Sequence, residues 1–203
     1  MILLEYFLDN QDRLMIHKPT CYFEVYERYF QKYINTNIKV LEIGIGQGGS
    51  LKMWKEYFGT GCQIVGIDIN AKCLKFKEPG INIYTGDQAD VIFLSNVIKA
   101  EFAFDIIIDD GGHSMNQQIT SFSFLFQFLN EGGIYLCEDV GTSYRKEYRD
   151  CDDTFIEMAK RQVDKVNNID SLTKAIYFHD SMVLFEKGRK EQHDTLAIGK
   201  ATI

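Results

Sequence analysis

Five short apolar runs cross the middle of the chain, and stretches suited to helices separate them. The runs cover 39–45, 63–69, 81–85, 104–109 and 133–137. Runs of this length are typical of strands that are buried on both faces of a parallel sheet. Parallel strands need crossover connections, and we expect helices over 50–58, 88–100 and 114–129. The alternation predicts a doubly wound α/β fold with helices on both faces.

Residues 121–128 (SFSFLFQF) alternate in a way that also suits a strand. Their place between two buried strands favours a helix, because parallel strands must be joined by a crossover. Near the C-terminus, a helix is expected over 154–166. Two strands, 175–178 and 182–186, should then form a hairpin, with one of them antiparallel to the rest.

The N-terminal part carries aromatic residues at helical spacing. A helix is expected over 19–34, since Pro19 suits a helix start. Its apolar stripe should pack on the core and consists of Phe23, Tyr26, Phe30, Tyr33 and Ile34. We expect Trp54, in the helix over 50–58, to lie in the core as well. The chain divides into a helical extension (1–37), a core domain (38–187) and a tail (188–203).

Composition narrows the class of protein. The chain has 203 residues, which suits one domain, and 29 acidic against 22 basic residues give a net charge of −7. No run of Lys or Arg is present, so a nucleic-acid partner is not expected. The five cysteines lack C-x-x-C spacing, which argues against a disulfide framework or a zinc site. The N-terminal apolar run ends at Leu8 without a basic region, so we expect a cytoplasmic protein with no membrane association.

A glycine-rich loop follows the first predicted strand and precedes a helix. It matches G-x-G-x-x-G through Gly44, Gly46 and Gly49. Glycines let the backbone approach a ligand closely, and the helix N-terminus offers unpaired N–H groups. Asp68 ends the second strand about 20 residues further on, where a carboxylate can accept hydrogen bonds from a ribose diol. The set predicts a cofactor that contains a nucleoside.

Two further acidic residues distinguish S-adenosylmethionine from NAD as the predicted cofactor. Glu42 lies just before Gly44, where a carboxylate would repel a pyrophosphate but would suit the ammonium group of S-adenosylmethionine. Asp87 follows the third strand and can bind an adenine amino group. S-adenosylmethionine is therefore favoured over NAD. The predicted cofactor site comprises Glu42, Gly44, Gly46, Gly49, Ser50, Asp68, Ile69, Asp87, Gln88 and Asp109.

Carboxylates also gather at the ends of the fourth and fifth strands. Asp109 and Asp110 end one strand, and Glu138 and Asp139 end the other. Clustered carboxylates repel one another unless a cation lies among them, and their oxygens suit Mg²⁺ or Mn²⁺. We predict a Mg²⁺ site made by Asp110, Glu138 and Asp139, which would lower the pKa of an acceptor hydroxyl. His113 could take the hydroxyl proton as general base. His17 and His179 are expected to be structural or surface groups.

Several blocks of the sequence carry a family resemblance: VLEIGIGQGGSLKMWKEYF, GIDI, GDQAD, FDIIIDDGGHSMNQQITSF and YLCEDVGTSY. Together they resemble the class I S-adenosylmethionine-dependent methyltransferases, in particular the macrolide-sugar O-methyltransferases of the macrocin and mycinamicin type. They also resemble the bacterial group labelled cephalosporin hydroxylase. The resemblance implies a Rossmann-like, seven-stranded, mostly parallel sheet whose last strand is antiparallel. It also implies metal ligands at Asp110, Glu138 and Asp139, and a base at His113.

The resemblance implies methyl transfer to a hydroxyl of a sugar, in a glycan or a glycosylated natural product. A homo-oligomer is compatible with it. Relatives carry Trp and His where this chain has Pro19 and Cys21, a large polar residue at Gly141, and a second His at Gln117. These departures bear on the acceptor, for which Tyr144 is a candidate contact. Two alternatives remain open: an O-methyltransferase for catechols or phenols, and a non-catalytic accessory subunit that binds S-adenosylmethionine. An NAD-dependent dehydrogenase is more remote.

Overall fold

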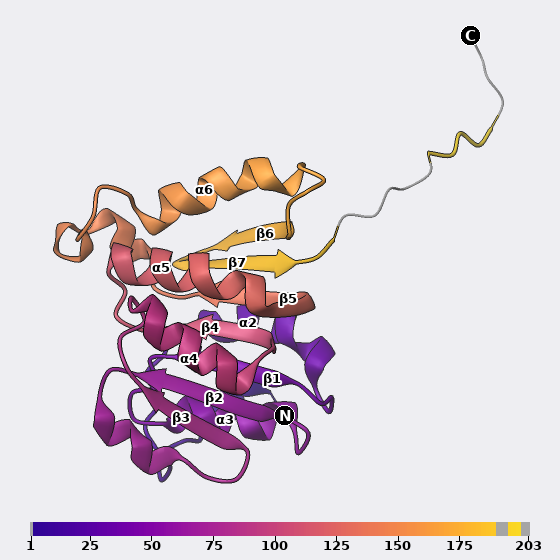
Figure 1. Ribbon diagram of the computed structural model, residues 1–203. Helices are drawn as coiled ribbons and strands as arrows, with labels where there is room; N and C mark the ends of the chain where they lie inside the picture. Colours follow the sequence, from indigo (N-terminus) through magenta and orange to yellow (C-terminus); the bar gives the residue numbers. More distant parts are fainter. Residues whose placement is uncertain (1, 190–194, 200–203) are drawn as a thin grey trace.

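The predicted strands form one seven-stranded sheet (Figure 1). The computed structural model describes residues 2–189 and 195–199. The strands are β1 (Lys39–Ile43), β2 (Gln63–Asp68), β3 (Ile81–Thr85), β4 (Phe104–Asp109), β5 (Leu129–Cys137), β6 (Thr173–His179) and β7 (Met182–Lys187). Their order is β3-β2-β1-β4-β5-β7-β6. Strands β1 to β5 pair in parallel, and β7 runs antiparallel to β5 and β6, which confirms the expected sheet and C-terminal hairpin.

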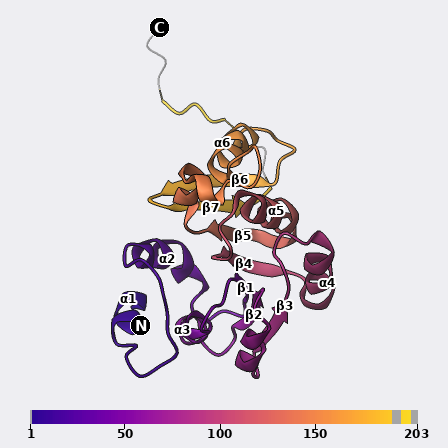
Figure 2. The same cartoon turned by 90° about the vertical axis from the view of Figure 1, so that its left-hand side faces the viewer.

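Helices cover both faces of this sheet (Figure 2). They are α1 (Leu3–Leu8), α2 (Tyr22–Phe30), α3 (Gly49–Phe58), α4 (Val91–Glu101), α5 (Met115–Leu125) and α6 (Phe155–Val166). Helices α1 to α3 lie on one face and α4 to α6 on the other. Successive strand residues point to opposite faces, so Ile106 and Ile108 pack with the first group and Ile107 with the second. The sheet is therefore buried on both sides, as the apolar runs predict.

Short 3-10 helices connect or extend the main elements, at Gln31–Tyr33, Ala71–Phe76, Phe126–Phe128, Val140–Tyr144 and Lys146–Tyr148. They explain two differences from the expected boundaries. Helix α2 is shorter than 19–34 because its end continues as a 3-10 turn. The segment expected as one helix over 114–129 leaves α-helical geometry after Leu125, and Leu129 already pairs with Phe104 in β5.

Helix α4 begins later than expected because Asp90 caps it. The Asp90 carboxylate accepts hydrogen bonds from the backbone N–H groups of Ile92 (2.8 Å) and Phe93 (3.2 Å). These N–H groups have no partner within a helix, so a side-chain acceptor fixes the helix start.

The N-terminal part packs on the α3 side of the sheet. Phe23, Tyr26 and Phe30 of α2 are buried, and Trp54 of α3 is fully enclosed and meets the Tyr26 ring edge-on at 5.1 Å. The expectation that Trp54 lies in the core is confirmed. Helix α1, which the sequence pattern did not predict, joins the same cluster through Leu3.

The predicted tail over 188–203 lies partly outside the described residues, which stop at 189 and resume at 195–199. Within the described ranges, no helix combines the length and the apolar character needed to cross a membrane. The five cysteines are free thiols.

Candidate functional site

The strand order reverses between β1 and β4, so the ends of these strands open on one crevice. Gly44 follows β1 and Asp110 follows β4. Gly44 adopts φ 84°, and a Cβ atom there would lie 2.0 Å from the backbone oxygen of Asp110. Only glycine permits this approach. The glycine loop and the acidic segment are therefore in direct contact, although 66 residues separate them (110 − 44).

A first cavity of about 150 Å³ lies beside this contact. The predicted cofactor residues that line it are Gly44, Asp68, Ile69, Asp87 and Gln88. One of its two acidic side chains, Asp68, is oriented by the backbone: its carboxylate accepts hydrogen bonds from the N–H groups of Gly46 (3.0 Å) and Asn70 (2.8 Å). Ile69 leaves 72% of its surface exposed at the rim. A slot with apolar walls and fixed carboxylates suits the base and ribose of a nucleoside.

A larger cavity of about 570 Å³ shares Gly44 with the first. Its lining includes the predicted residues Gly44, Gly46, Ser50, Asp110, His113, Glu138 and Asp139. The segment Met15, Ile16, His17, Lys18 and Pro19 forms another part of its wall, together with Tyr148. The cofactor loop and the acid cluster thus open into one space. His17, which the sequence suggested was structural or a surface group, lines this cavity.

Glu42 of β1 is fully buried and lies behind Ser50, which lines the larger cavity. One carboxylate oxygen accepts a hydrogen bond from the Ser50 hydroxyl (2.9 Å). The other, Oε1, accepts no hydrogen bond and lies 3.8 Å from the Lys18 ammonium nitrogen. Burial raises the pKa of Glu42, against the opposing effects of Lys18, Ser50 and Trp54. A buried carboxylate oxygen without a hydrogen-bond donor, beside a glycine loop, is a suitable acceptor for a ligand ammonium group.

Three predicted cofactor residues line neither cavity: Glu42, Asp109 and Gly49. Asp109 is fully buried on the α5 side, because side chains alternate along β4. Its carboxylate accepts hydrogen bonds from Gln88 Nε2 (2.8 Å), Tyr135 OH (2.7 Å) and the Ser121 hydroxyl. Gln88 in turn accepts from the N–H of Gly112 (2.8 Å). The expectation of a direct cofactor contact is therefore corrected for Asp109, which instead fixes Gln88.

Gly49 requires a similar correction. A Cβ at Gly49 would lie 2.4 Å from the backbone oxygens of Leu14 and Met15. The third glycine of the loop therefore permits the N-terminal segment to pack against α3, and it lines neither cavity.

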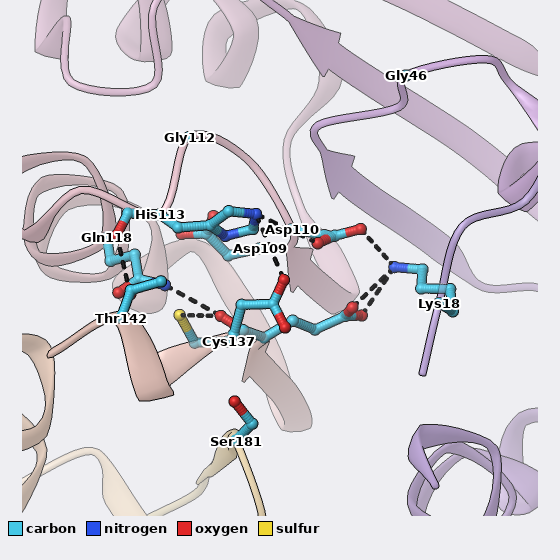
Figure 3. Close-up of polar contacts among 12 residues, drawn as sticks. Lys18, Gly46, Asp109, Asp110, Gly112, His113, Gln118, Cys137, Thr142 and Ser181 are labelled. Atoms are coloured by element: carbon cyan, nitrogen blue, oxygen red, sulfur yellow. Dashed lines mark hydrogen bonds and ion pairs between the residues drawn. The ribbon is translucent and has the colours of Figure 1, made fainter. Parts of the chain in front are cut away.

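The acid cluster is made of Asp110, His113, Glu138 and Asp139, which line the larger cavity together. Figure 3 shows Asp110 and His113 side by side. The His113 Nε2 atom lies 3.8 Å from Asp110 Oδ1 and 3.5 Å from Asp139 Oδ2. Asp110, His113 and Asp139 can each offer one ligand atom, all within 4.8 Å of one another, which suits a metal ion. Both His113 (φ 58°) and Asp139 (φ 52°) adopt left-handed backbone conformations. Such strained conformations are concentrated at functional sites.

Lys18 and Tyr26 take up the oxygens of Glu138. The Lys18 Nζ atom lies 2.9 Å from Glu138 Oε2, 3.0 Å from Oε1 and 2.7 Å from Asp110 Oδ2 (Figure 3). The Tyr26 hydroxyl donates to Glu138 Oε1 at 2.7 Å. Glu138 is thus close to the other acids, as predicted, but its oxygens already have partners from the N-terminal part of the chain.

The sequence reasoning missed Lys18 and placed Tyr26 only in the core. Part of the signal was present: Tyr22 and Tyr26 are four residues apart, so their hydroxyls follow one face of the expected helix, which Lys18 precedes. The Tyr22 hydroxyl donates to Asp139 Oδ1 at 2.6 Å. All three side chains end at the acid cluster.

Burial and neighbouring charges shift the pKa values of Lys18 and Glu138 in opposite directions. Burial alone would lower the pKa of Lys18, but the carboxylates of Asp110, Glu138 and Glu42 outweigh it and raise the pKa, so Lys18 carries its charge. Burial raises the pKa of Glu138, while the Lys18 ammonium and the hydrogen bonds from Lys18 and Tyr26 oppose this shift.

Two other residues named from the sequence lie apart from the cavities. His179 bonds to the Tyr29 hydroxyl through Nε2 (3.0 Å), in keeping with a structural role. The Tyr144 side chain is 69% exposed and lines neither cavity.

Comparison with known proteins finds relatives that are named as sugar O-methyltransferases. The chain is 33% identical, over 208 residues, to an 8-demethyl-8-alpha-L-rhamnosyl tetracenomycin-C 2'-O-methyltransferase of Streptomyces olivaceus; the match covers 91% of this chain and 54% of that protein. It is also 33% identical, over 193 residues, to a mycinamicin VI 2''-O-methyltransferase of Micromonospora griseorubida, covering 82% and 48%. The chain therefore spans about half the length of these curated relatives. No family model matches it.

Among solved structures, the MycE methyltransferase of the mycinamycin biosynthetic pathway superposes with a TM-score of 0.80 at 30% identity, covering 92% of this chain and 53% of that one. That structure was determined in complex with Mg, SAH and mycinamycin VI. These similarities confirm the resemblance to sugar O-methyltransferases and the Rossmann-like class I methyltransferase fold.

Proposed function

We propose that this chain is an O-methyltransferase, since it shares its fold and about a third of its residues with sugar O-methyltransferases. It transfers a methyl group from S-adenosylmethionine to a hydroxyl of a glycosylated natural product or glycan. A bound Mg²⁺ ion assists the transfer. One observation carries the proposal: the acid cluster with His113 opens into the same cavity as the glycine loop. A methyl donor and a metal-bound acceptor could therefore meet there. Because the chain spans about half of its relatives, the acceptor is part of this proposal.

The residues around the cofactor loop fit S-adenosylmethionine. Glu42 Oε1, which has no hydrogen-bond donor and lies 3.8 Å from Lys18 Nζ, would accept a hydrogen bond from the ammonium group of the methionine part. Asp68 would bind the ribose diol and Asp87 the adenine amino group, while Gly44, Ile69 and Gln88 line the nucleoside slot. Gly46 and Ser50 line the larger cavity on the methionine side.

The acid cluster fits a divalent cation. Asp110 and Asp139 each have one oxygen that faces His113 and is not bonded to the N-terminal part of the chain. Glu138 adds a third carboxylate, and it would bind the ion directly once an oxygen is released by Lys18. When bound, Mg²⁺ supplies positive charge that orients an acceptor hydroxyl and lowers its pKa.

His113 is the proposed general base. Its Nε2 faces the cavity between Asp110 and Asp139, and its Nδ1 is buried without a hydrogen-bond partner. The neutral imidazole would take the proton of the acceptor hydroxyl as the oxygen attacks the methyl carbon. Most of the remaining rate gain would come from holding donor and acceptor in line.

Three segments of the chain would have different roles. The core domain over 38–187 would bind both cofactors, the extension over 1–37 would complete the cavity wall, and 188–203 would be a tail. We also propose a cytoplasmic location and an acceptor that is a small molecule or glycan, with no nucleic-acid or membrane partner. A homo-oligomer is compatible with this arrangement.

Transfer of labelled methyl groups to an acceptor panel tests the proposal. The panel should contain rhamnosides and other glycosides with vicinal hydroxyls, the matching aglycones, and simple catechols. We expect methylation of the glycosides and not of the aglycones or catechols. EDTA should abolish activity because it removes the metal. Asp110→Asn should lose turnover but still bind S-adenosylhomocysteine. Methylation of catechols without glycosides would favour the phenolic alternative. Full activity of Asp110→Asn would contradict the metal role.

A further inference from the structure

The N-terminal residues Lys18, Tyr22 and Tyr26 reach the acid cluster from one direction. Tyr22 and Tyr26 are four residues apart on one face of α2, and Lys18 lies in the segment that precedes this helix. Each side chain ends on a different combination of carboxylate oxygens. Lys18 binds Asp110 Oδ2, Tyr22 binds Asp139 Oδ1, and Lys18 and Tyr26 together bind Glu138. The contacts span 92 to 120 positions in the sequence.

In each aspartate, the two carboxylate oxygens have different partners. Asp110 gives Oδ2 to Lys18, and its Oδ1 faces His113. Asp139 gives Oδ1 to Tyr22, and its Oδ2 faces His113. In both residues one oxygen is fixed by the N-terminal part of the chain, and the other is left toward the cavity. A cation placed beside His113 would meet the two free oxygens.

Tyr22 holds Asp139 at two points. Its hydroxyl donates to Asp139 Oδ1 at 2.6 Å and accepts a hydrogen bond from the Asp139 backbone N–H at 3.3 Å. The same hydroxyl lies 3.4 Å from the backbone oxygen of Ser181. Asp139 has a left-handed backbone (φ 52°), a conformation that costs free energy and persists only when its surroundings enforce it. The Tyr22 ring is almost completely buried, so the hydroxyl has little freedom to move.

We propose that Tyr22 is a positioning residue for the metal site: its hydroxyl fixes Asp139 so that Oδ2 is presented to a divalent cation, and Lys18 does the same for Asp110. This inference rests on the proposed metal-dependent function and extends it. It makes the N-terminal stretch a structural part of the cation site. Hydrogen-bonding partners of metal ligands typically change metal affinity by about 10- to 100-fold when they are removed.

Direct cation binding to Tyr22→Phe tests the inference. The substitution removes one hydroxyl and keeps the buried ring. Mn²⁺ is the probe, because free and bound Mn²⁺ can be distinguished by electron paramagnetic resonance without any acceptor. The matched control is Tyr29→Phe on the same helix, whose hydroxyl bonds to His179 and not to an acid of the cluster. S-adenosylhomocysteine affinity and thermal unfolding are measured on all three proteins.

We expect the Mn²⁺ dissociation constant of Tyr22→Phe to rise about 10- to 100-fold, while that of Tyr29→Phe stays within about twofold of the unmodified chain. S-adenosylhomocysteine affinity should change little in either variant. Equal Mn²⁺ affinity in all three proteins would overturn the inference and leave the proposed function standing. A parallel loss of S-adenosylhomocysteine affinity in Tyr22→Phe would also overturn it, since the effect would then be global. If the unmodified chain binds no Mn²⁺, the metal part of the proposed function fails as well.

Discussion

Replacing Lys18 by Met should leave the acid cluster without its internal counter-ion. The Lys18 side chain is 3% exposed and Glu138 is 1% exposed, with Nζ at 2.9 Å from a Glu138 oxygen and 2.7 Å from Asp110. Removing one partner of a buried ion pair typically costs about 3 to 5 kcal/mol, because the other charge stays buried and unpaired. For a chain of this size each kcal/mol lowers Tm by about 2 to 4 °C, so we expect a fall of about 6 to 20 °C.

Thermal unfolding followed by circular dichroism in EDTA measures this effect. The double variant Lys18→Met with Glu138→Gln should recover part of the lost stability, since it removes the unpaired charge as well. Lys160→Met is the matched control, because Lys160 pairs with Glu157 at the exposed surface, and its Tm should be nearly unchanged. A Tm for Lys18→Met within about 2 °C of the unmodified chain, a shift that corresponds to about 1 kcal/mol or less, would refute the reasoning.

Two further substitutions probe the chemistry of the cavity. His113→Asn keeps a residue that tolerates the left-handed backbone, and it should lower the single-turnover rate of methyl transfer by about 10²- to 10⁴-fold; an unchanged rate would remove His113 as base. Glu42→Gln should weaken S-adenosylhomocysteine binding by at least about tenfold, the loss of one hydrogen bond to a charged group. Because burial raises the pKa of Glu42, affinity in the unmodified chain should rise with pH above about 4.5 as the carboxylate ionises, and the Gln variant should lack this dependence. Both statements can be checked by calorimetric titration between about pH 5 and pH 8, the range in which folded proteins are typically most stable.

The sheet and its crevice could be predicted because they follow from local patterns. Runs such as 104–109 are apolar on both faces, and glycines and acids stand at the strand ends. The doubly wound topology then places Gly44 beside Asp110 without any further information. Exact helix limits were less predictable, because a cap such as Asp90 or a 3-10 turn after Leu125 moves a boundary without changing the apolar pattern.

The missed part of the site consists of residues whose roles depend on distant partners. Tyr26 reads as a core residue from its spacing, and its ring is indeed buried, yet its hydroxyl ends on Glu138 112 positions away. Asp109 shows the opposite error: it ends a strand beside Asp110, but the alternation of the strand points it to the other face. Sequence position predicted which strand ends carry acids, and side-chain direction determined which of them reach the cavity.

The most direct test of the account is a calorimetric titration of the purified chain with S-adenosylhomocysteine in buffer that contains Mg²⁺. The account rests on one cavity that joins the glycine loop and the acid cluster, with Glu42 buried behind Ser50 of its wall. It predicts saturable binding at one site per chain, weakened in Glu42→Gln and retained in Asp110→Asn. Absence of binding by the unmodified chain would contradict the account at its base.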